Sequence, residues 1–148
     1  FYFLGWEHPR CIAGSPTAST RPQKFTTSAY NSNDETKSEI NQIKPNIFLN
    51  QNQKVVETGY ANILILQQGK FLTPSLDSGC LPGITRQLLI QHFDIDEALF
   101  TWDDLMNSDG VYLCSSVRLI KHVSKVEDKL FEPKEIGLKL IGDFNQFN

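Results

Sequence analysis

The sequence contains few cysteines and no long hydrophobic segment. Its 148 residues include only Cys11, Cys80 and Cys114, and an odd number of cysteines without a C-x-x-C spacing argues against a disulfide framework or a zinc site. Reduced thiols in a cytoplasmic protein are the simplest interpretation. No apolar segment approaches the roughly 20 residues that a membrane-spanning helix requires. We therefore expect a cytoplasmic protein that binds no metal and does not contact a membrane.

Basic residues are not in excess either. The chain has 14 lysines and arginines against 17 acidic residues, a formal net charge of −3, whereas a nucleic-acid surface needs a basic stripe. Hydrophobic residues make up 40% and charged residues 21% of the chain, which is typical of a globular domain. The chain begins with Phe1. We expect residues 1–23 to be the end of a preceding segment or linker, and residues 24–148 to form one domain.

Short apolar runs separated by turn residues predict strands. The runs lie at residues 46–49, 55–56, 61–66, 71–73 and 111–114, with a weaker one at 123–126. Residues 74–83, with two prolines and two glycines, predict a loop. Three segments predict helices, at residues 84–93, 102–106 and 133–144. The alternation of strands and helices predicts a mixed α/β (α+β) fold.

The helix predictions include caps and buried faces. Thr85 is the expected N-cap of the first helix, with Ile84, Leu88 and Leu89 on its buried face, and Thr101 is the expected cap of the second. The third helix should begin near Pro133. Its buried stripe should contain Ile136, Leu140 and Ile141.

The segment Gly79–Arg86 (GCLPGITR) contains the first candidate site. A loop with two glycines leads into a predicted helix, and the first amides of a helix have no partners within it and lie at the positive end of its dipole. The amides of Ile84 and Thr85, with the Thr85 hydroxyl, could therefore hold a phosphate. Most junctions of this kind bind nothing, so the pattern alone leaves both interpretations open.

Further candidate positions also have two interpretations each. Glu57 ends an apolar strand, and it is either a solvated strand end or a buried acid paired with a cationic ligand group. Lys24 follows a loop rich in proline, and from the residues alone it is most simply a surface lysine. Ser115 and Ser116 follow a predicted strand, where small hydroxyl residues suit either a phosphate contact or an ordinary turn.

Some of these segments occur together in one known enzyme family. Glu57–Asn62 (ETGYAN), Leu72–Pro74 (LTP) and Gly79–Arg86 resemble, in order and spacing, segments of the class IV aminotransferases. The resemblance covers about residues 23–123. It implies a pyridoxal 5′-phosphate enzyme with the large cofactor-binding domain of the D-amino-acid aminotransferase-like fold.

The resemblance also implies roles for individual residues. Glu57 would contact the pyridine nitrogen of the cofactor and keep it protonated, which makes the ring an electron sink. Ile84 and Thr85 would hold the phosphate through their amides, and Leu81 would pack on the ring. Lys24, 33 residues before Glu57, would bind the cofactor covalently and serve as acid and base. The lysines between them lie too close to the glutamate.

The segment Val111–Arg118 (VYLCSSVR) is similar to the second loop of the family. Ser116 would contact the phosphate, and Ser115 and Arg118 would contact the substrate. The Ser-Ser-x-Arg form and Lys24–Tyr30 (KFTTSAY) are most similar to aminodeoxychorismate lyases, which produce p-aminobenzoate and pyruvate for folate biosynthesis. Transamination of branched-chain or D-amino acids is the alternative, because the first loop is common to both activities.

The sequence also departs from the family pattern. Tyr30 lies later than the family tyrosine, and Leu119–His122 (LIKH) replaces the usual glycine and proline. The family has a small N-terminal domain, which we expect to be absent from this chain, and its members are usually homodimers that act on small amino-acid-like substrates. A third hypothesis is therefore a truncated, non-catalytic relative.

Overall fold

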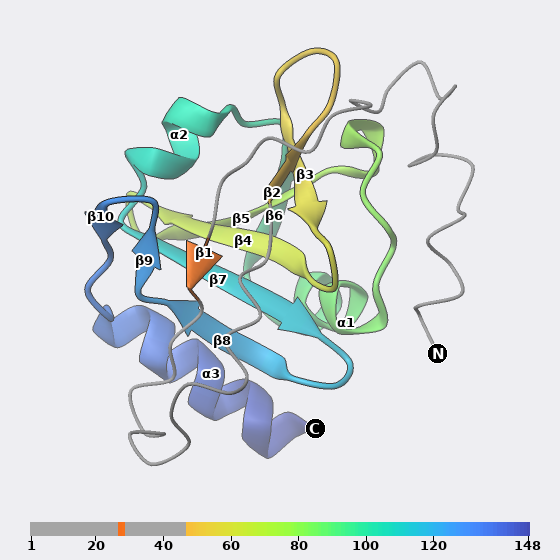
Figure 1. Ribbon diagram of the computed structural model, residues 1–148. Helices are drawn as coiled ribbons and strands as arrows, with labels where there is room; N and C mark the ends of the chain where they lie inside the picture. Colours follow the sequence, from red (N-terminus) through yellow and green to blue (C-terminus); the bar gives the residue numbers. More distant parts are fainter. Residues whose placement is uncertain (1–26, 29–46) are drawn as a thin grey trace.

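The computed structural model describes residues 27–28 and 47–148 (Figure 1). The predictions for residues 1–23, Lys24 and Tyr30 fall outside these ranges. The centre of the fold is a five-stranded sheet in which all neighbours are antiparallel except β5 and β6. In spatial order its strands are β6 (Ile95–Ala98), β5 (Lys70–Pro74), β4 (Asn62–Gln67), β7 (Gly110–Ser115) and β8 (Leu119–Val123).

Successive residues of β4 point to opposite faces of the sheet, as strand geometry requires. Ile63 and Ile65 pack into one hydrophobic cluster, and Leu64 and Leu66 pack into another on the opposite face. Because both faces are covered, β4 has an almost continuous apolar sequence, which explains why the predicted strand at 61–66 is confirmed. The strand predicted at 111–114 is confirmed as β7 for the same reason.

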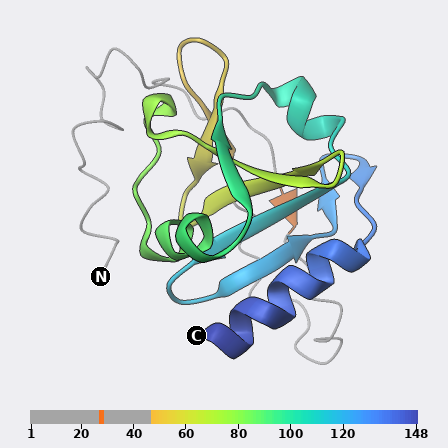
Figure 2. The same ribbon diagram turned by 180° about the vertical axis from the view of Figure 1, so that it is seen from behind.

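Helices α1 (Ile84–His92) and α3 (Glu135–Phe147) cover one face of the sheet (Figure 2). The prediction that Thr85 caps α1 is wrong, because Gly83 occupies the N-cap and Thr85 lies inside the helix. The predicted buried face is right at Leu89 and wrong at Ile84. The side chain of Ile84 is 54% exposed, whereas Arg86 and Leu89 are buried.

Helix α3 begins at Glu135, so Pro133 precedes it, and it extends to Phe147. Its buried residues are Gly137, Leu140 and Phe144. The predicted stripe is therefore right at Leu140 and wrong at Ile136, which is 42% exposed. Gly137 is buried because the helix approaches the sheet closely there; a Cβ at this position would overlap the hydroxyl of Tyr112.

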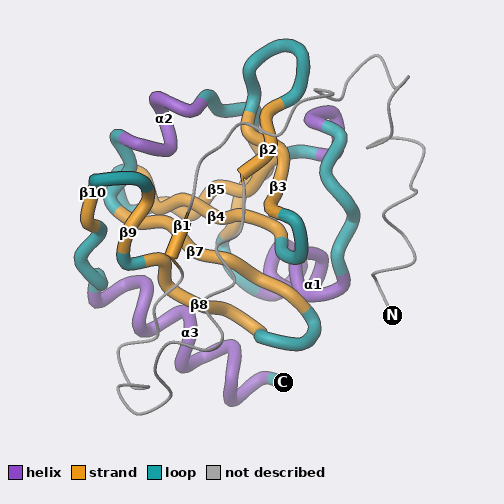
Figure 3. Tube along the Cα trace, viewed as in Figure 1, coloured by secondary structure: helices purple, strands orange, loops and turns teal. Residues whose placement is uncertain are grey.

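The opposite face is covered by smaller elements (Figure 3). They are the antiparallel pair β2 (Ile47–Leu49) and β3 (Val55–Thr58), helix α2 (Trp102–Met106), and a small sheet of β1 (Thr27–Ser28), β9 (Lys125–Val126) and β10 (Lys129–Leu130). Helix α2 and its Thr101 cap are confirmed: the Thr101 hydroxyl accepts from the amide of Asp104, and the Asp104 carboxylate accepts from the amide of Thr101. The run predicted at 123–126 is divided between β8 and β9.

The fold is the mixed α/β arrangement that the sequence predicts, with strands and helices both contributing to two hydrophobic clusters. The loop predicted at 74–83 contains a single turn of 3₁₀ helix, η2 (Leu76–Ser78). None of the helices within the described ranges is both long and apolar enough to cross a bilayer.

Candidate active site

Three connections meet at one end of the central sheet. They are the turn at 59–61 between β3 and β4, the loop at 75–83 before α1, and the turn at 116–118 between β7 and β8. Strand pairing brings two of them together, because Asn62 at the start of β4 lies opposite Cys114 near the end of β7. Both ribbon views show α1 beginning beside these turns (Figures 1 and 2). The candidate residues of the sequence, apart from Lys24, lie in or beside these connections.

Glu57 is a buried acid. Every residue of β3 is buried, and the side chain of Glu57 is 4% exposed. Its Oε2 accepts a hydrogen bond from the amide of Leu81 at 3.1 Å. The interpretation as a solvated strand end is therefore wrong, since a carboxylate at this depth needs hydrogen-bond donors or a cationic partner. Its role towards a cofactor stays a prediction.

Asn62 joins this acid to the loop before α1. Its Nδ2 donates to Oε2 of Glu57 at 3.3 Å and to the carbonyl oxygen of Leu81 at 3.0 Å. The loop also passes so close that a Cβ at Gly83 would overlap Oδ1 of Asn62. Asn62 was not among the functional residues predicted from the sequence. The signal that could have found it is an amide side chain directly before the apolar run of residues 63–66 in β4.

The turn between β3 and β4 is held by Thr58. Its hydroxyl accepts from the amide of Ala61 at 3.1 Å and donates to the carbonyl of Ala61 at 3.0 Å. A threonine that bonds to the backbone three residues on stabilises a tight turn. The turn therefore sets the orientation of Tyr60 and of Asn62, which opens the next strand.

The start of α1 presents backbone amides. Gly83 caps the helix without a side-chain hydrogen bond among the described residues, and the first helical bond runs from Gln87 N to Gly83 O at 2.9 Å. The amides of Ile84 and Thr85 precede that bond, so the helix itself offers them no acceptor. They lie three and four residues beyond Leu81, whose backbone contacts Glu57.

A buried arginine fixes this helix start to the sheet. The Arg86 side chain is 3% exposed, and its Nη2 donates to the carbonyl of Pro74 at 2.9 Å and pairs with Glu97 of β6. Arg86 was not among the functional residues predicted from the sequence. Arginine is usually exposed, and its partners here are distant in the sequence, so local pattern offered no signal.

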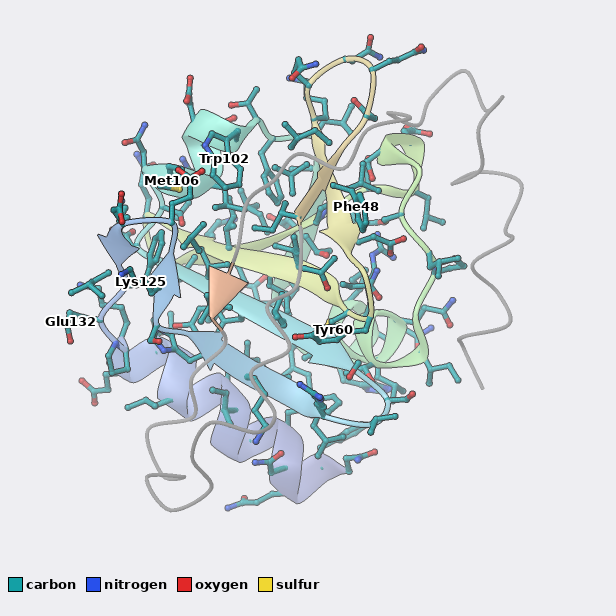
Figure 4. All side chains as sticks on the ribbon, in the orientation of Figure 1. Phe48, Tyr60, Trp102, Met106, Lys125 and Glu132 are labelled. Atoms are coloured by element: carbon teal, nitrogen blue, oxygen red, sulfur yellow. The ribbon has the colours of Figure 1, made fainter. Side chains whose placement is uncertain are left out.

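The turn between β7 and β8 faces the turn between β3 and β4. The Ser115 hydroxyl accepts from the amide of Arg118 at 3.1 Å, and the Arg118 guanidinium lies 5.0 Å from the centroid of the Tyr60 ring. Ser116 and Arg118 are exposed. Figure 4 shows Tyr60 at the end of the sheet where α1 begins. Burial raises the pKa of Tyr60, and the positive charge of Arg118 opposes this rise.

Two buried cysteines lie nearby. The Cys80 thiol donates to the carbonyl of Pro74 at 3.4 Å, and burial raises its pKa, an effect that the neighbouring Ser78 hydroxyl and the Arg86 charge reduce. Burial also raises the pKa of Cys114 to about 12. Thiols with raised pKa values are poor nucleophiles. These cysteines therefore act as small core residues at neutral pH.

The described residues fit a planar ligand that carries a protonated ring nitrogen and a phosphate. Glu57 is a buried carboxylate that would suit a cationic nitrogen, and its Oε2 accepts hydrogen bonds from Asn62 and Leu81. The uncapped amides at Ile84 and Thr85 suit a phosphate. Pyridoxal 5′-phosphate combines these two groups in one molecule.

Comparison with known proteins points to one family. The family model of amino-transferase class IV matches residues 13–126. The chain is 29% identical over 109 residues to a protein of Thermotoga maritima assigned as a branched-chain-amino-acid aminotransferase, covering 68% of this chain and 40% of that protein. It is 28% identical over 108 residues to an aminodeoxychorismate lyase of Vibrio harveyi, covering 67% of this chain and 40% of the lyase.

Solved structures agree with this family. The crystal structure of a Legionella pneumophila protein assigned as a 4-amino-4-deoxychorismate lyase is similar with a TM-score of 0.67 and 32% identity, covering 71% of this chain and 41% of that one. The chain thus spans about 40% of the length of the curated relatives named above. Because the family model covers well over half of this sequence, the chain belongs to the class IV aminotransferases, a family of enzymes that depend on pyridoxal phosphate.

Proposed function

We propose that this chain forms the cofactor-binding part of a pyridoxal-phosphate lyase that converts aminodeoxychorismate to p-aminobenzoate and pyruvate. The observation that carries the proposal is the contact between Glu57 and Leu81, because it joins a buried acid to the segment that leads into α1. A ring acid and a phosphate site must lie within one molecule's reach of each other. In this chain only two residues separate Leu81 from Ile84, the first residue of α1.

The proposed cofactor contacts follow from this arrangement. Glu57 would hold the proton on the ring nitrogen, and the amides of Ile84 and Thr85 would bind the phosphate. Leu81 would pack on the ring, and Ser116 would add a phosphate contact from the second turn. When bound, pyridoxal phosphate supplies a ring that withdraws electrons from the substrate.

Lys24 is the proposed acid and base. It would bind the cofactor covalently, and after release by the amine of the substrate it would move the proton of the carbon that carries this amine. We propose that residues 24–148 form the cofactor-binding domain and that Lys24 lies in its site. We further propose that the complete protein is a cytoplasmic homodimer of folate biosynthesis.

The Ser-Ser-x-Arg sequence of the second turn, which resembles that of aminodeoxychorismate lyases, supports the lyase. Ser115 and Arg118 form a closed turn in which the guanidinium lies over Tyr60, and an exposed arginine there suits a substrate with carboxylates. Transamination of branched-chain or D-amino acids is the second candidate, because the branched-chain relative and the lyase relative match this chain at nearly the same identity.

The cofactor contacts are tested by absorbance. The full chain is incubated with pyridoxal 5′-phosphate, dialysed, and scanned for a visible absorption band above 400 nm. We expect a band that is lost in Lys24→Ala and kept in Lys37→Ala, the matched control. A protein that takes up no cofactor would support the non-catalytic relative and overturn the proposal.

The reaction is tested by a paired assay on the longest open reading frame that contains this chain. Release of p-aminobenzoate from aminodeoxychorismate supports the lyase. Amination of a branched-chain keto acid without release of p-aminobenzoate supports the aminotransferase and overturns the lyase assignment.

A further inference from the structure

We propose that Asn62 is a positioning residue that holds the ring acid Glu57 and the start of α1 in a fixed relative arrangement, so that both contact the same cofactor molecule. This inference rests on the proposed binding of pyridoxal phosphate. It adds a residue to which the sequence analysis gave no role. Asn62 lies at the start of β4, between the two groups that it joins, and its side chain is 7% exposed.

The contacts of Asn62 belong to two separate segments. One Nδ2 atom carries two hydrogens, and its two acceptors are Oε2 of Glu57 at 3.3 Å, from β3, and the carbonyl of Leu81 at 3.0 Å, from the loop before α1. The amide of Leu81 donates to the same Oε2 at 3.1 Å. The acid, the amide and the loop therefore form a closed set of hydrogen bonds, and a shift of one requires a shift of the others.

The loop is also held by shape. A Cβ at Gly83 would overlap Oδ1 of Asn62, so the last residue before α1 lies directly against this side chain. Gly83 is the N-cap of α1. The position of the Asn62 amide thus determines how closely the amides of Ile84 and Thr85 can approach a ligand that is bound at Glu57.

The side chain at position 62 must be a hydrogen-bond donor, because both of its partners, Oε2 of Glu57 and the carbonyl of Leu81, are acceptors. Aspartate has nearly the same shape as asparagine, but it would bring a second carboxylate to the buried Oε2 of Glu57 and offer no hydrogen to Leu81. Two buried carboxylates in contact cannot both ionise easily, so they share a proton. Asn62→Asp therefore changes the charge and the hydrogen bonding while it keeps the volume.

The experiment compares the affinity of the full chain for pyridoxal 5′-phosphate and for pyridoxal, which lacks the phosphate. We expect Asn62→Ala and Asn62→Asp to lower the affinity for pyridoxal 5′-phosphate about tenfold or more, because a buried hydrogen bond to a charged group is lost. The affinity for pyridoxal should fall less, because pyridoxal has no phosphate and does not bind at Glu57 and at the start of α1 simultaneously. Gly83→Ala disturbs the same contact from the side of the loop, and we expect it to lower the affinity for pyridoxal 5′-phosphate in the same way.

Asn50 provides a matched control. It is also buried, at 3% exposed, and its Nδ2 donates to the carbonyl of Ser78 in the same loop, three residues before Leu81. Within the described part of the chain, its side chain bonds to Ser78, Asn52 and Lys54 and not to Glu57. We expect Asn50→Asp to lower the melting temperature but to leave cofactor affinity within about twofold of the wild type. An equal loss of affinity in Asn50→Asp would show general loosening of the core and overturn the inference.

A pH series gives a readout that a purely structural role would not move. The ratio of the affinities of Asn62→Asp and Asn62→Ala cancels the titration of the phosphate and the influence of the groups that lie nearby, Cys80, Arg86 and Glu97, because both variants share them. We expect Asn62→Asp to bind more weakly than Asn62→Ala at pH 8, and to recover relative to it at pH 5.5, where the carboxylate pair shares a proton. A constant ratio overturns the inference.

The outcomes separate this inference from the proposed function. If the wild type binds the cofactor and all Asn62 variants bind it equally, positioning by Asn62 is wrong and the proposed function stands. If the wild type binds no pyridoxal phosphate, the proposed function is wrong and this inference falls with it. Circular dichroism of each variant confirms that the comparison is made between folded proteins, and Gly83→Ala replaces any Asn62 variant that does not fold.

Discussion

The guanidinium of Arg118 lies over the ring of Tyr60, 5.0 Å from its centroid. This stacking joins the turn after β7 to the turn before β4, two segments that are far apart in the sequence. A guanidinium that stacks on a ring through its face keeps its N–H groups at the edge available for carboxylates. The arrangement therefore suits Arg118 to orient an acidic substrate beside the cofactor.

We predict that Arg118→Gln raises the KM for the amino-acid-like substrate about tenfold or more, because a charge-assisted hydrogen bond is lost. The affinity for pyridoxal phosphate should stay within about twofold. Arg118→Lys should be intermediate, since it keeps the charge and loses the planar stacking. Lys121→Gln, on the adjacent β8, is the control and should leave KM unchanged. Steady-state kinetics and a cofactor titration measure both quantities, and an equal loss in both would contradict a role towards the substrate.

We predict that Arg86→Met lowers the free energy of unfolding by about 1–3 kcal/mol, because the buried carbonyl of Pro74 loses its charged donor and keeps only the weaker Cys80 thiol. Glu97→Gln should cost less than about 1 kcal/mol, since the Glu97 side chain is 42% exposed and water screens the pair. Urea unfolding of the two variants measures the difference. An equal cost in both variants would mean that the ion pair, and not the Pro74 carbonyl, accounts for the stability.

The parts of the fold that sequence predicts well are those with buried faces on both sides. Strand β4 and strand β7 are continuous apolar runs, and α2 has a complete capping box. Strand β6 was missed because it lies at the edge of the sheet, where of its four residues only Ile95 is buried. Strand β8 was missed because its sequence, LIKHV, has mixed polarity and its first residue, Leu119, has a positive φ of 54°.

The candidate site was predictable where its residues belong to a recognisable motif of the sequence. Resemblance directed attention to Glu57, Leu81 and the start of α1, and these are brought together by a hydrogen bond. Asn62 and Arg86 were assigned no role, because their importance depends on contacts between segments 11 to 19 residues apart. Such contacts leave no periodic pattern in a single sequence. The cap of α1 was mispredicted because glycine, required there by the Asn62 side chain, displaces the better cap Thr85.

We predict opposite effects for two glycines of α3. Gly142→Ala should raise the free energy of unfolding by about 0.5–1 kcal/mol, because a Cβ there meets nothing within 4 Å and alanine favours the helix. Gly137→Ala gains the same helix propensity but drives a methyl group into the Tyr112 ring, and such overpacking typically costs about 1–3 kcal/mol. Thermal or urea unfolding of both variants tests the packing of α3 on the sheet. A stabilising Gly137→Ala would show that α3 lies farther from Tyr112.

Acid sensitivity should arise in part from His122 of β8. Its ring lies 5.4 Å from that of Tyr112, and its Nε2 is buried without a partner in the described part of the chain. Burial lowers the pKa of His122, and the charge of Glu132 opposes this only in part. The unfolded chain therefore takes up the proton first as the pH falls. The contribution of His122 to stability is fully present above about pH 6.5, the ordinary pKa of histidine. It is lost as the pH falls from there through the lower pKa of the folded protein.

We predict that His122→Gln reduces the loss of unfolding free energy between pH 7.5 and pH 5, because the glutamine has no proton to take up. His92→Gln, at an exposed position of α1, is the control and should keep the pH profile of the wild type. Urea unfolding of the wild type and both variants at both pH values gives the three differences that are needed. If His122→Gln and the wild type lose the same stability on acidification, the proton is taken up elsewhere, and the burial of His122 does not cause the acid sensitivity.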